Sequence, residues 1–517
     1  MTIERSPSRP LASALALGAL LLGASCSKAP DARPSFLLIS IDTLRADHVG
    51  CYGYERDTTP HLDALAARGY RFDQCATVSE NTLISHASMF TGLTAVAHGT
   101  TYVGDGRVLH DNYRTIAEDF RDAGYQTAGF NSHGAWLNEA YGMAQGFETF
   151  VHGHDDADAL LPKVEEWLAK RDRSKPFFVF LHLFDVHSDV VGRPYQAKPP
   201  HLGRWTSDYA GEFTDWETRK PSGSNFLNAV NAGKIELSPE DDRYLVDQYD
   251  EGLATLDERL GRFLDELDGD VKRTTWITVT SDHGEEFGEH GKYMHGTVFD
   301  GIQRVPLIVV PPEVEKDRLG PPRVLEPQVR IVEIRPTLAS LAGLAPPAYC
   351  EGNDLVPFLA GESTLPPDCP GIFKRHALRY NGLKLIPPRT LFDLRADPGE
   401  TANVATERAE DVDRMRARFQ DLVASGEAKR AQVYAGAPEI SPTEDPERRA
   451  QLEALGYLVG GKKKQGGKEP PSADSRRRDA LLEELGRVQR AASEGDRAAR
   501  ERVEEIKREL AELDSSD

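Results

Sequence analysis

The chain has 517 residues and a formal net charge of −21, from 62 Lys and Arg against 83 Asp and Glu. This acidic balance excludes a protein that binds nucleic acid through phosphate contacts, because such binding requires clustered Lys and Arg. Hydrophobic residues make up 39% of the chain, which is enough for a large core and excludes wholesale disorder.

The first 26 residues have the pattern of a signal peptide. Arg5 and Arg9 precede an apolar stretch over residues 11–22, which is too short to cross a bilayer that needs roughly 20 apolar residues. Cys26 follows Gly-Ala-Ser and resembles the lipid-accepting cysteine of bacterial lipoproteins. We therefore expect an exported protein, either a periplasmic or cell-envelope lipoprotein tethered through a lipid on Cys26 or a plain secreted one.

From residue 35 to residue 345, apolar runs alternate with helical patterns. This alternation predicts an α/β/α sandwich with a mainly parallel central sheet that helices cover on both faces. The expected strands are 36–41, 127–130, 177–184, 276–280 and 305–310, and the expected helices are 61–68, 115–123, 159–169 and 239–267.

A smaller unit is predicted over residues 346–457. Short runs at 377–380, 383–386 and 390–394 indicate antiparallel strands, and a helix is expected over 404–424, which makes an antiparallel α+β subdomain. A Gly- and Lys-rich stretch at 458–474 is typical of a flexible linker. The tail at 475–517 has two charged helical patterns with apolar stripes, which indicate either a helical segment that binds a protein partner or a solvated tail.

The cysteines leave two pairings open. Cys350 and Cys369 flank a loop and could form a disulfide in an oxidising compartment, and Cys51 and Cys75 could form another. Spacing alone does not determine which cysteines are connected.

Three ligand-type side chains directly follow predicted strands. Asp42 follows the strand at 36–41, and Asp282 and His283 follow the strand at 276–280. Functional sites in open parallel sheets form at the carboxyl ends of the strands, so we expect these side chains on one rim. Two carboxylates and an imidazole suit a divalent cation that keeps open positions for substrate.

Thr82 lies just before a helix predicted over residues 83–91. The amide groups and the positive dipole end at the start of a helix attract anionic esters, which indicates a nucleophile or a ligand. The alternative is that Thr82 is only the N-cap of this helix.

Together these segments resemble the sulfatase branch of the alkaline-phosphatase superfamily over about residues 36–403. The resemblance begins with Asp42, the helix that ends in Phe90-Thr91-Gly92, and Ser281-Asp-His-Gly-Glu-Glu-Phe-Gly-Glu-His-Gly. It continues with His295-Gly296, Arg304-Val-Pro-Leu-Ile and Leu391-Phe-Asp-Leu-Arg-Ala-Asp-Pro-Gly-Glu-Thr-Ala-Asn403. It implies an α/β sandwich with a small C-terminal antiparallel subdomain and hydrolysis of ester bonds.

The resemblance also implies a role for individual residues. Asp42, Thr82, Asp282 and His283 would ligate the metal, and Thr82 would be the nucleophile. His187 and His295 would face the ester oxygens or the leaving group, and Asp185 would assist substrate binding or hold a second metal. We expect the remaining histidines of these segments to be hydrogen-bonded scaffold: His86, His98, His182 and His290.

The sequence departs from classical sulfatases at the nucleophile. Their motif, Cys/Ser-x-Pro-x-Arg, is oxidised to formylglycine, whereas this chain has Thr82-Leu-Ile-Ser-His86, so no formylglycine is expected. Here it resembles phosphodiesterases, phosphonate monoester hydrolases and phosphoethanolamine transferases. Thr43 stands where many classical members have a second Asp, which with His283 favours Zn²⁺ or Mn²⁺ over Ca²⁺.

The sequence thus predicts an exported, metal-dependent hydrolase of phosphate or sulfate esters, acting on a small-molecule, glycan or lipid ester through a covalent Thr82 intermediate. An arylsulfatase-like sulfuric ester hydrolase is one alternative. A transferase of phospho-headgroups is another alternative. The prediction that no other segment crosses a membrane counts against it. The last alternative is a non-catalytic binding protein on the same scaffold.

Overall fold

The computed structural model describes residues 33–101, 107–188, 194–195, 197–214, 223–345, 349–364, 371–374 and 376–434, together with Arg502. The chain divides into two compact units, Met1–Leu452 and Glu453–Asp517. The predicted signal peptide with Cys26, the linker and, apart from Arg502, the helical tail lie outside the described residues. Within the described residues, no helix is both long and apolar enough to span a membrane.

Nine strands of the described chain form one central sheet. Strands β1, β3, β4, β5 and β6 run parallel, and β9 is antiparallel to both β6 and β2. The spatial order is β10 (Arg323–Leu325), β2 (Tyr70–Ala76), β9 (Arg304–Val310), β6 (Thr275–Thr280), β1 (Ser35–Ile41), β5 (Phe177–Leu183), β3 (Gln126–Asn131) and β4 (Thr149–His152), with β11 (Val329–Arg330) paired to β2. This confirms the predicted, mainly parallel α/β sheet.

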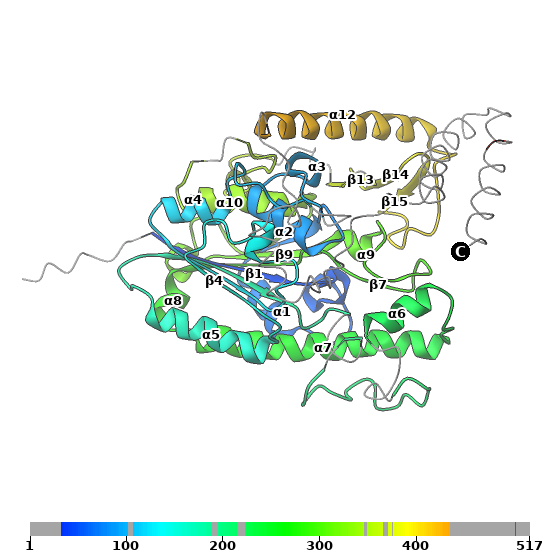
Figure 1. Ribbon diagram of the computed structural model, residues 1–517, viewed down its shortest axis with the longest axis horizontal. Helices are drawn as coiled ribbons and strands as arrows, with labels where there is room; N and C mark the ends of the chain where they lie inside the picture. Colours follow the sequence, from blue (N-terminus) through cyan, green and yellow to red (C-terminus); the bar gives the residue numbers. More distant parts are fainter. Residues whose placement is uncertain are drawn as a thin grey trace, which may run out of the picture. The chain divides into compact units, whose positions relative to one another are not determined.

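Helices cover both faces of this sheet (Figure 1). One layer contains α2 (Thr82–Thr91), α4 (Ile116–Asp122) and α10 (Ile334–Leu341), and the other contains α1 (Pro60–Ala66), α5 (Ala157–Lys170), α7 (Pro239–Glu266) and α8 (Gly269–Thr274). Further helices are α3 (Ala95–His98), α6 (Ser224–Asn231), α9 (Asp300–Gln303) and α11 (Val356–Leu359).

The continuous apolar run of β1 is explained by this double cover. Phe36 and Leu38 belong to the core on the α2 side of the sheet, whereas Leu37 and Ile39 belong to the core on the α7 side. Alternate side chains of a strand point to opposite faces, so a strand covered on both sides needs apolar residues throughout. This confirms the buried central strand predicted at residues 36–41.

The small sheet is antiparallel, as predicted. Its order is β12 (Gly371–Phe373), β13 (Ala377–Tyr380), β14 (Leu383–Ile386) and β15 (Thr390–Asp393), and it packs against α12 (Ala409–Val433). Helix α12 begins and ends later than the predicted 404–424. It continues through Gly426, and this glycine packs closely on α3: an added Cβ would lie 2.9 Å from the Val96 side chain.

The structure does not contain the Cys51–Cys75 disulfide considered from the sequence. Both thiols are free. Cys75 is buried in the core on the α2 side of the sheet, while Cys51 packs against the core on the α7 side, so the sheet separates them. The Cys350 thiol is also free, and its suggested partner Cys369 lies outside the described residues.

Candidate active site

Asp42 and Asp282 lie side by side because their strands are neighbours. Strands β1 and β6 pair in parallel with Ser40 opposite Thr280, so the residues after each strand leave the sheet at the same rim. The Asp42 amide donates to the Leu183 carbonyl of β5 at 2.8 Å, which extends the sheet pairing to the site. Both side chains, and that of His283, are fully buried.

Three ligand atoms converge at this rim. His283 Nε2 lies 3.8 Å from Asp42 Oδ1 and 3.4 Å from Asp282 Oδ2. These same three atoms are buried without a hydrogen-bond partner. His283 Nδ1 donates to the Gly284 carbonyl at 3.0 Å, so the lone pair of Nε2 faces the two carboxylates. Buried polar atoms are normally satisfied, so three unsatisfied ones facing each other fit the donor set of a divalent cation.

The electrostatics of the rim also favour a cation. Burial raises the pKa of Asp42, and burial together with the charge of Asp42 raises the pKa of Asp282 to about 6. Burial and the neighbouring His295 lower the pKa of His283 to about 4, which keeps this imidazole neutral and able to ligate. The fold therefore concentrates negative charge here without supplying a Lys or Arg partner in the described contacts.

Thr82 contacts the same rim from α2. It is the first residue of that helix, and the N-cap is Asn81, whose side chain accepts from the Ile84 amide at 3.4 Å. The interpretation of Thr82 as a mere N-cap is therefore wrong. Its hydroxyl donates to Asp42 Oδ2 at 3.3 Å, and the residue is 7% exposed. We call Asp42, Thr82, Asp282 and His283 the Asp42 cluster.

His187 and His295 lie beside the Asp42 cluster. The His295 ring centroid is 4.6 Å from that of His283 and 4.9 Å from that of His187. Burial lowers the pKa of His295, but the Glu285 carboxylate, 3.4 Å from its Nδ1, outweighs burial and the net pKa is raised. Burial and the two neighbouring imidazoles hold the pKa of His187 well below its usual value. The pair thus combines one imidazole whose pKa is raised with another whose pKa is lowered.

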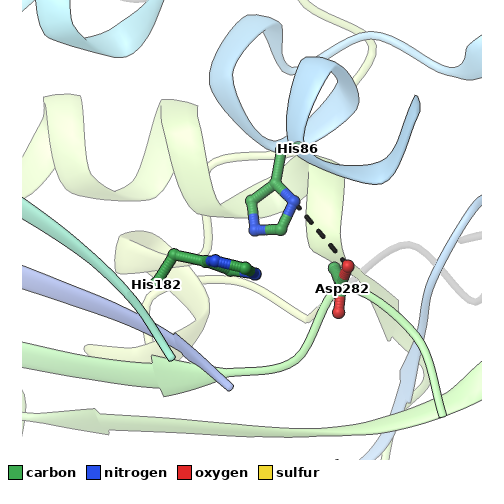
Figure 2. Close-up of side chains that lie close together, drawn as sticks. All are labelled: His86, His182 and Asp282. Carbon is green, nitrogen blue, oxygen red and sulfur yellow. Dashed lines mark ion pairs between the residues drawn. The ribbon is translucent and has the colours of Figure 1, made fainter. Parts of the chain in front are cut away.

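Two further histidines, His86 and His182, lie close to Asp282 (Figure 2). His182 of β5 donates through Nε2 to Asp42 Oδ2 at 3.1 Å. His86 of α2 donates through Nδ1 to the Thr82 carbonyl at 2.8 Å, and the same atom lies 3.8 Å from Asp282 Oδ2. Its Nε2 lies 2.9 Å from the Ser40 hydroxyl, which can donate to it. These contacts hold Asp42 and the first turn of α2 in place, and the same two histidines form with Asp282 a second group that could hold a metal ion.

The family of the chain follows from comparison with known proteins. A family model described as Sulfatase matches residues 34–344, well over half of the chain. This chain belongs to the sulfatase family. It is therefore a hydrolase that acts on ester bonds. The sequence motifs predicted this family, within the alkaline-phosphatase superfamily.

Individual relatives match most of the chain at low identity. An arylsulfatase from Clostridium perfringens is 24% identical, over 74% of this chain and 93% of its own length. An N-acetylglucosamine-6-O-sulfatase from Bacteroides thetaiotaomicron is 25% identical, over 77% and 87%. The solved phosphonate monoester hydrolase of Agrobacterium radiobacter shares the fold, with a TM-score of 0.61, 21% identity and coverage of 76% and 96%.

Other histidines of the sulfatase-family motifs have structural partners. His98 Nε2 lies 2.8 Å from the Ser88 hydroxyl of α2. His290 Nδ1 lies 2.9 Å from the Glu286 carboxylate. Both arrangements have the scaffold character expected from the sequence.

The side chain of Asp185 contacts the N-terminus of α5. Its Oδ1 accepts from the Ala157 amide at 2.9 Å, so this carboxylate supports a helix N-terminus. Burial raises its pKa to about 7. Two groups of described residues could hold a metal ion, Asp42 with Asp282 and His283 and His86 with His182 and Asp282, and Asp185 belongs to neither.

Sequence reasoning missed two residues of this sulfatase-family site. Glu285, which contacts His295, was quoted within a motif but given no role. His133 follows β3, and its ring stacks on Phe184 at 4.3 Å, which in turn stacks on His187 at 4.1 Å. The rule that selected Asp42 would have found His133, because β3 is the neighbour of β5 in the same sheet.

Proposed function

We propose that this sulfatase-family chain is a metal-dependent hydrolase that cleaves phosphate esters through a covalent intermediate on Thr82. The observation that carries the proposal is the contact of Thr82 Oγ1 with Asp42 Oδ2, at the N-terminus of α2 and beside three unsatisfied ligand atoms. A hydroxyl in this position has a carboxylate to accept its proton and helix amides to attract an anionic ester.

Asp42, Asp282, His283 and Thr82 would hold the divalent cation. When bound, such an ion supplies positive charge that favours the deprotonated nucleophile and withdraws charge from the ester oxygens. The imidazole nitrogen and the small number of carboxylate oxygens favour Zn²⁺ or Mn²⁺, while Ca²⁺ prefers six to eight oxygen ligands.

The chain's own residues support two displacement steps. In the first, a bond forms between Thr82 Oγ1 and phosphorus while the bond to the leaving oxygen breaks. The Thr82 proton passes to Asp42 Oδ2, and protonated His295 donates a proton to the leaving oxygen. In the second, water attacks phosphorus and gives a proton to His295, while Thr82 Oγ1 leaves and regains its proton from Asp42.

A threonine nucleophile favours attack on the phosphorus of a phosphate ester over attack on the sulfur of a sulfate ester. Classical sulfatases release sulfate when a hydrated formylglycine collapses back to an aldehyde, and a threonine ester has no such exit. A phosphothreonine can instead be attacked at phosphorus by water. The uncharged imidazole of His187 fits a role in holding the ester oxygens or the leaving group.

Sulfuric ester hydrolysis is the second candidate, because the relatives that match the chain over most of its length carry the names arylsulfatase and N-acetylglucosamine-6-O-sulfatase. The latter name also supports a glycan ester as substrate. Export, with a lipid on Cys26 or as a secreted protein, is part of the proposal and rests on the N-terminal pattern alone.

The test compares turnover of nitrophenyl phosphate, a phosphodiester, a phosphonate monoester and nitrophenyl sulfate by the purified protein, with Zn²⁺, Mn²⁺ and Ca²⁺ supplied separately. Phospho-ester turnover that far exceeds sulfate turnover, with Zn²⁺ or Mn²⁺ as the best ion, is the expected result. Dominant sulfate turnover would show that unmodified threonine supports desulfation and would overturn the preference for phosphorus.

A further inference from the structure

The turn that leads from Asp42 out of the central sheet has a strained backbone. Asp42 follows β1, and the next residue, Thr43, has a φ of 55°. A positive φ is an outlier for a β-branched residue, because the branched side chain crowds the backbone. Strain of this kind persists only where the surrounding structure holds it in place. The contacts of this turn therefore show what fixes the position of Asp42.

A single hydroxyl group bonds to the backbone on both sides of this turn. The Tyr249 hydroxyl of α7 donates to the Thr43 carbonyl at 2.9 Å and accepts from the Arg45 amide at 3.0 Å. A phenolic hydroxyl can donate one hydrogen bond and also accept, so it satisfies both backbone groups at once. Burial raises the pKa of Tyr249, which keeps the hydroxyl protonated and able to donate.

The ring of Tyr249 is fixed by the core. The residue is fully buried, and its ring centroid lies 4.8 Å from that of Phe287 and 5.3 Å from that of Tyr195. Close packing of aromatic rings holds a side chain in one orientation. The core therefore sets the direction of the hydroxyl, and the turn has to conform to it.

Two further hydroxyls bond the same turn to neighbouring segments. Thr43 Oγ1 donates to the Val186 carbonyl at 3.2 Å. Ser281 Oγ accepts from the Leu44 amide at 3.1 Å and donates to the His283 carbonyl at 2.6 Å. The turn is thus tied to the segments that follow β5 and β6. Its position sets that of the β1 ligand relative to the metal ligands that follow β6.

We propose that Tyr249 is a positioning residue: its hydroxyl holds the strained turn at Thr43 and thereby keeps the Asp42 carboxylate in the position that binds the divalent cation. The inference rests on the proposed function, since it concerns the cation of the same site. The hydroxyl acts through the backbone of the turn, because its printed partners are the Thr43 carbonyl and the Arg45 amide. Residues that orient metal ligands in this way commonly contribute about 10- to 100-fold in metal affinity.

The first experiment uses Tyr249→Phe, which removes the hydroxyl and keeps the ring. We expect the Kd for Zn²⁺, measured by competition with a chromophoric chelator, to rise about 10- to 100-fold. Tyr52→Phe is the matched control, because the Tyr52 hydroxyl also bonds to two backbone groups, the carbonyl of Leu307 at 3.2 Å and its amide at 2.8 Å. This variant loses the same kind of bonds on β9 and should bind Zn²⁺ as tightly as the wild type. The absorption spectrum of the Co²⁺-loaded protein, which depends on ligand geometry, should change in Tyr249→Phe alone.

The second experiment tests the strain. Glycine adopts a positive φ without steric cost, so a turn with Thr43→Gly does not need the hydroxyl to hold a strained residue. In that background Tyr249→Phe should weaken Zn²⁺ binding by a clearly smaller factor than in the wild type. An equal factor in both backgrounds would overturn the inference, because the hydroxyl would then act independently of the strained turn.

The remaining outcomes separate this inference from the proposed function. Unchanged Zn²⁺ affinity in Tyr249→Phe, or an equal loss in Tyr52→Phe, would overturn the inference and leave the proposed function intact. The expected loss of affinity, in a protein that cleaves none of the esters tested, would support the inference and contradict only the proposed hydrolysis. A wild-type protein that binds neither Zn²⁺ nor Co²⁺ would overturn both.

Discussion

The carboxylates of Asp42 and Asp282 and that of Asp300 are all largely buried, yet they have opposite surroundings. Asp300 Oδ1 lies 2.6 Å from Lys384 Nζ, and its Oδ2 lies 3.2 Å from Arg379 Nη2. Lys384 also contacts Glu400 at 3.0 Å. These four residues, the Asp300 cluster, join the small antiparallel sheet to the start of α9.

The same physical chemistry gives the two clusters different roles. Burial alone would raise the pKa of Asp300, but Arg379 and Lys384 outweigh it and hold that pKa well below its usual range. In the Asp42 cluster the pKa values of both carboxyls are raised, and three ligand atoms have no partner. The protein supplies its own cations at the junction between the subdomains, whereas at the rim of the main sheet three candidate ligand atoms have no hydrogen-bond partner.

The largest effect is expected from removing the nucleophile. Thr82→Ala should lower turnover of phosphate esters by a factor on the order of 10⁴ or more, as nucleophile removal does in other covalent enzymes. Thr82→Ser keeps the hydroxyl and should retain substantial activity. Because the Thr82 side chain contributes one long hydrogen bond of 3.3 Å, the melting temperature of both variants should stay close to that of the wild type. Residual turnover in Thr82→Ala close to the wild-type rate would remove Thr82 from its assigned role.

The next largest effect concerns the Asp300 cluster. Lys384→Met leaves two buried carboxylates without their shared cation and should lower the free energy of unfolding by about 3–5 kcal/mol. Chemical denaturation measures this, and Lys316→Met at an exposed position is the control. A Lys384→Met protein with unchanged stability would show that the cohesion between the subdomains does not depend on this cluster.

A smaller effect is expected from the metal. At a cation concentration about 100 times the dissociation constant, binding stabilises the folded state by about 2.7 kcal/mol, and a chelator should remove this increment. Asp282→Asn should abolish the increment, because it deletes one of the three converging ligand atoms. In metal-free solution the same variant should be as stable as the wild type or more so, since it relieves repulsion between two buried carboxylates. Melting curves with and without chelator test both statements, and a metal-dependent shift that survives Asp282→Asn would contradict the ligand assignment.

The last effect is a pH dependence that arises from Asp185. Its folded pKa of about 7 lies above the ordinary 3.8, so between these values the folded state holds a proton that the unfolded chain releases. The stabilisation from this group is therefore complete below pH 3.8 and is lost as the pH rises through about 7. Asp185→Asn keeps the acceptor for the Ala157 amide and should be more stable than the wild type above pH 7, where the wild type carries a buried charge, but equally stable in acid. A constant difference across this pH range would show that Asp185 does not titrate there.

Much of this architecture could be predicted from the sequence because it depends on local patterns. The apolar run of β1 requires cover on both faces, and Asp42 and Asp282 could be placed together because adjacent parallel strands end at one rim. The first strand of the small sheet, β12, and the antiparallel direction of β9 were not predicted, since strand pairing is decided by partners distant in the sequence. His133 and Glu285 were missed for a related reason: their importance comes from the rings and carboxylates that they contact.

The covalent intermediate on Thr82 is the central claim, and the stereochemical course at phosphorus tests it most directly. The protein would hydrolyse a phosphate ester whose phosphorus is made chiral by oxygen isotopes, in the presence of an alcohol acceptor, and the configuration of the transferred phosphoryl group would be determined. Two successive in-line displacements, first by Thr82 and then by the acceptor, predict net retention of configuration. Net inversion would mean that the acceptor attacks the substrate directly, and it would contradict the account of Thr82 as the nucleophile.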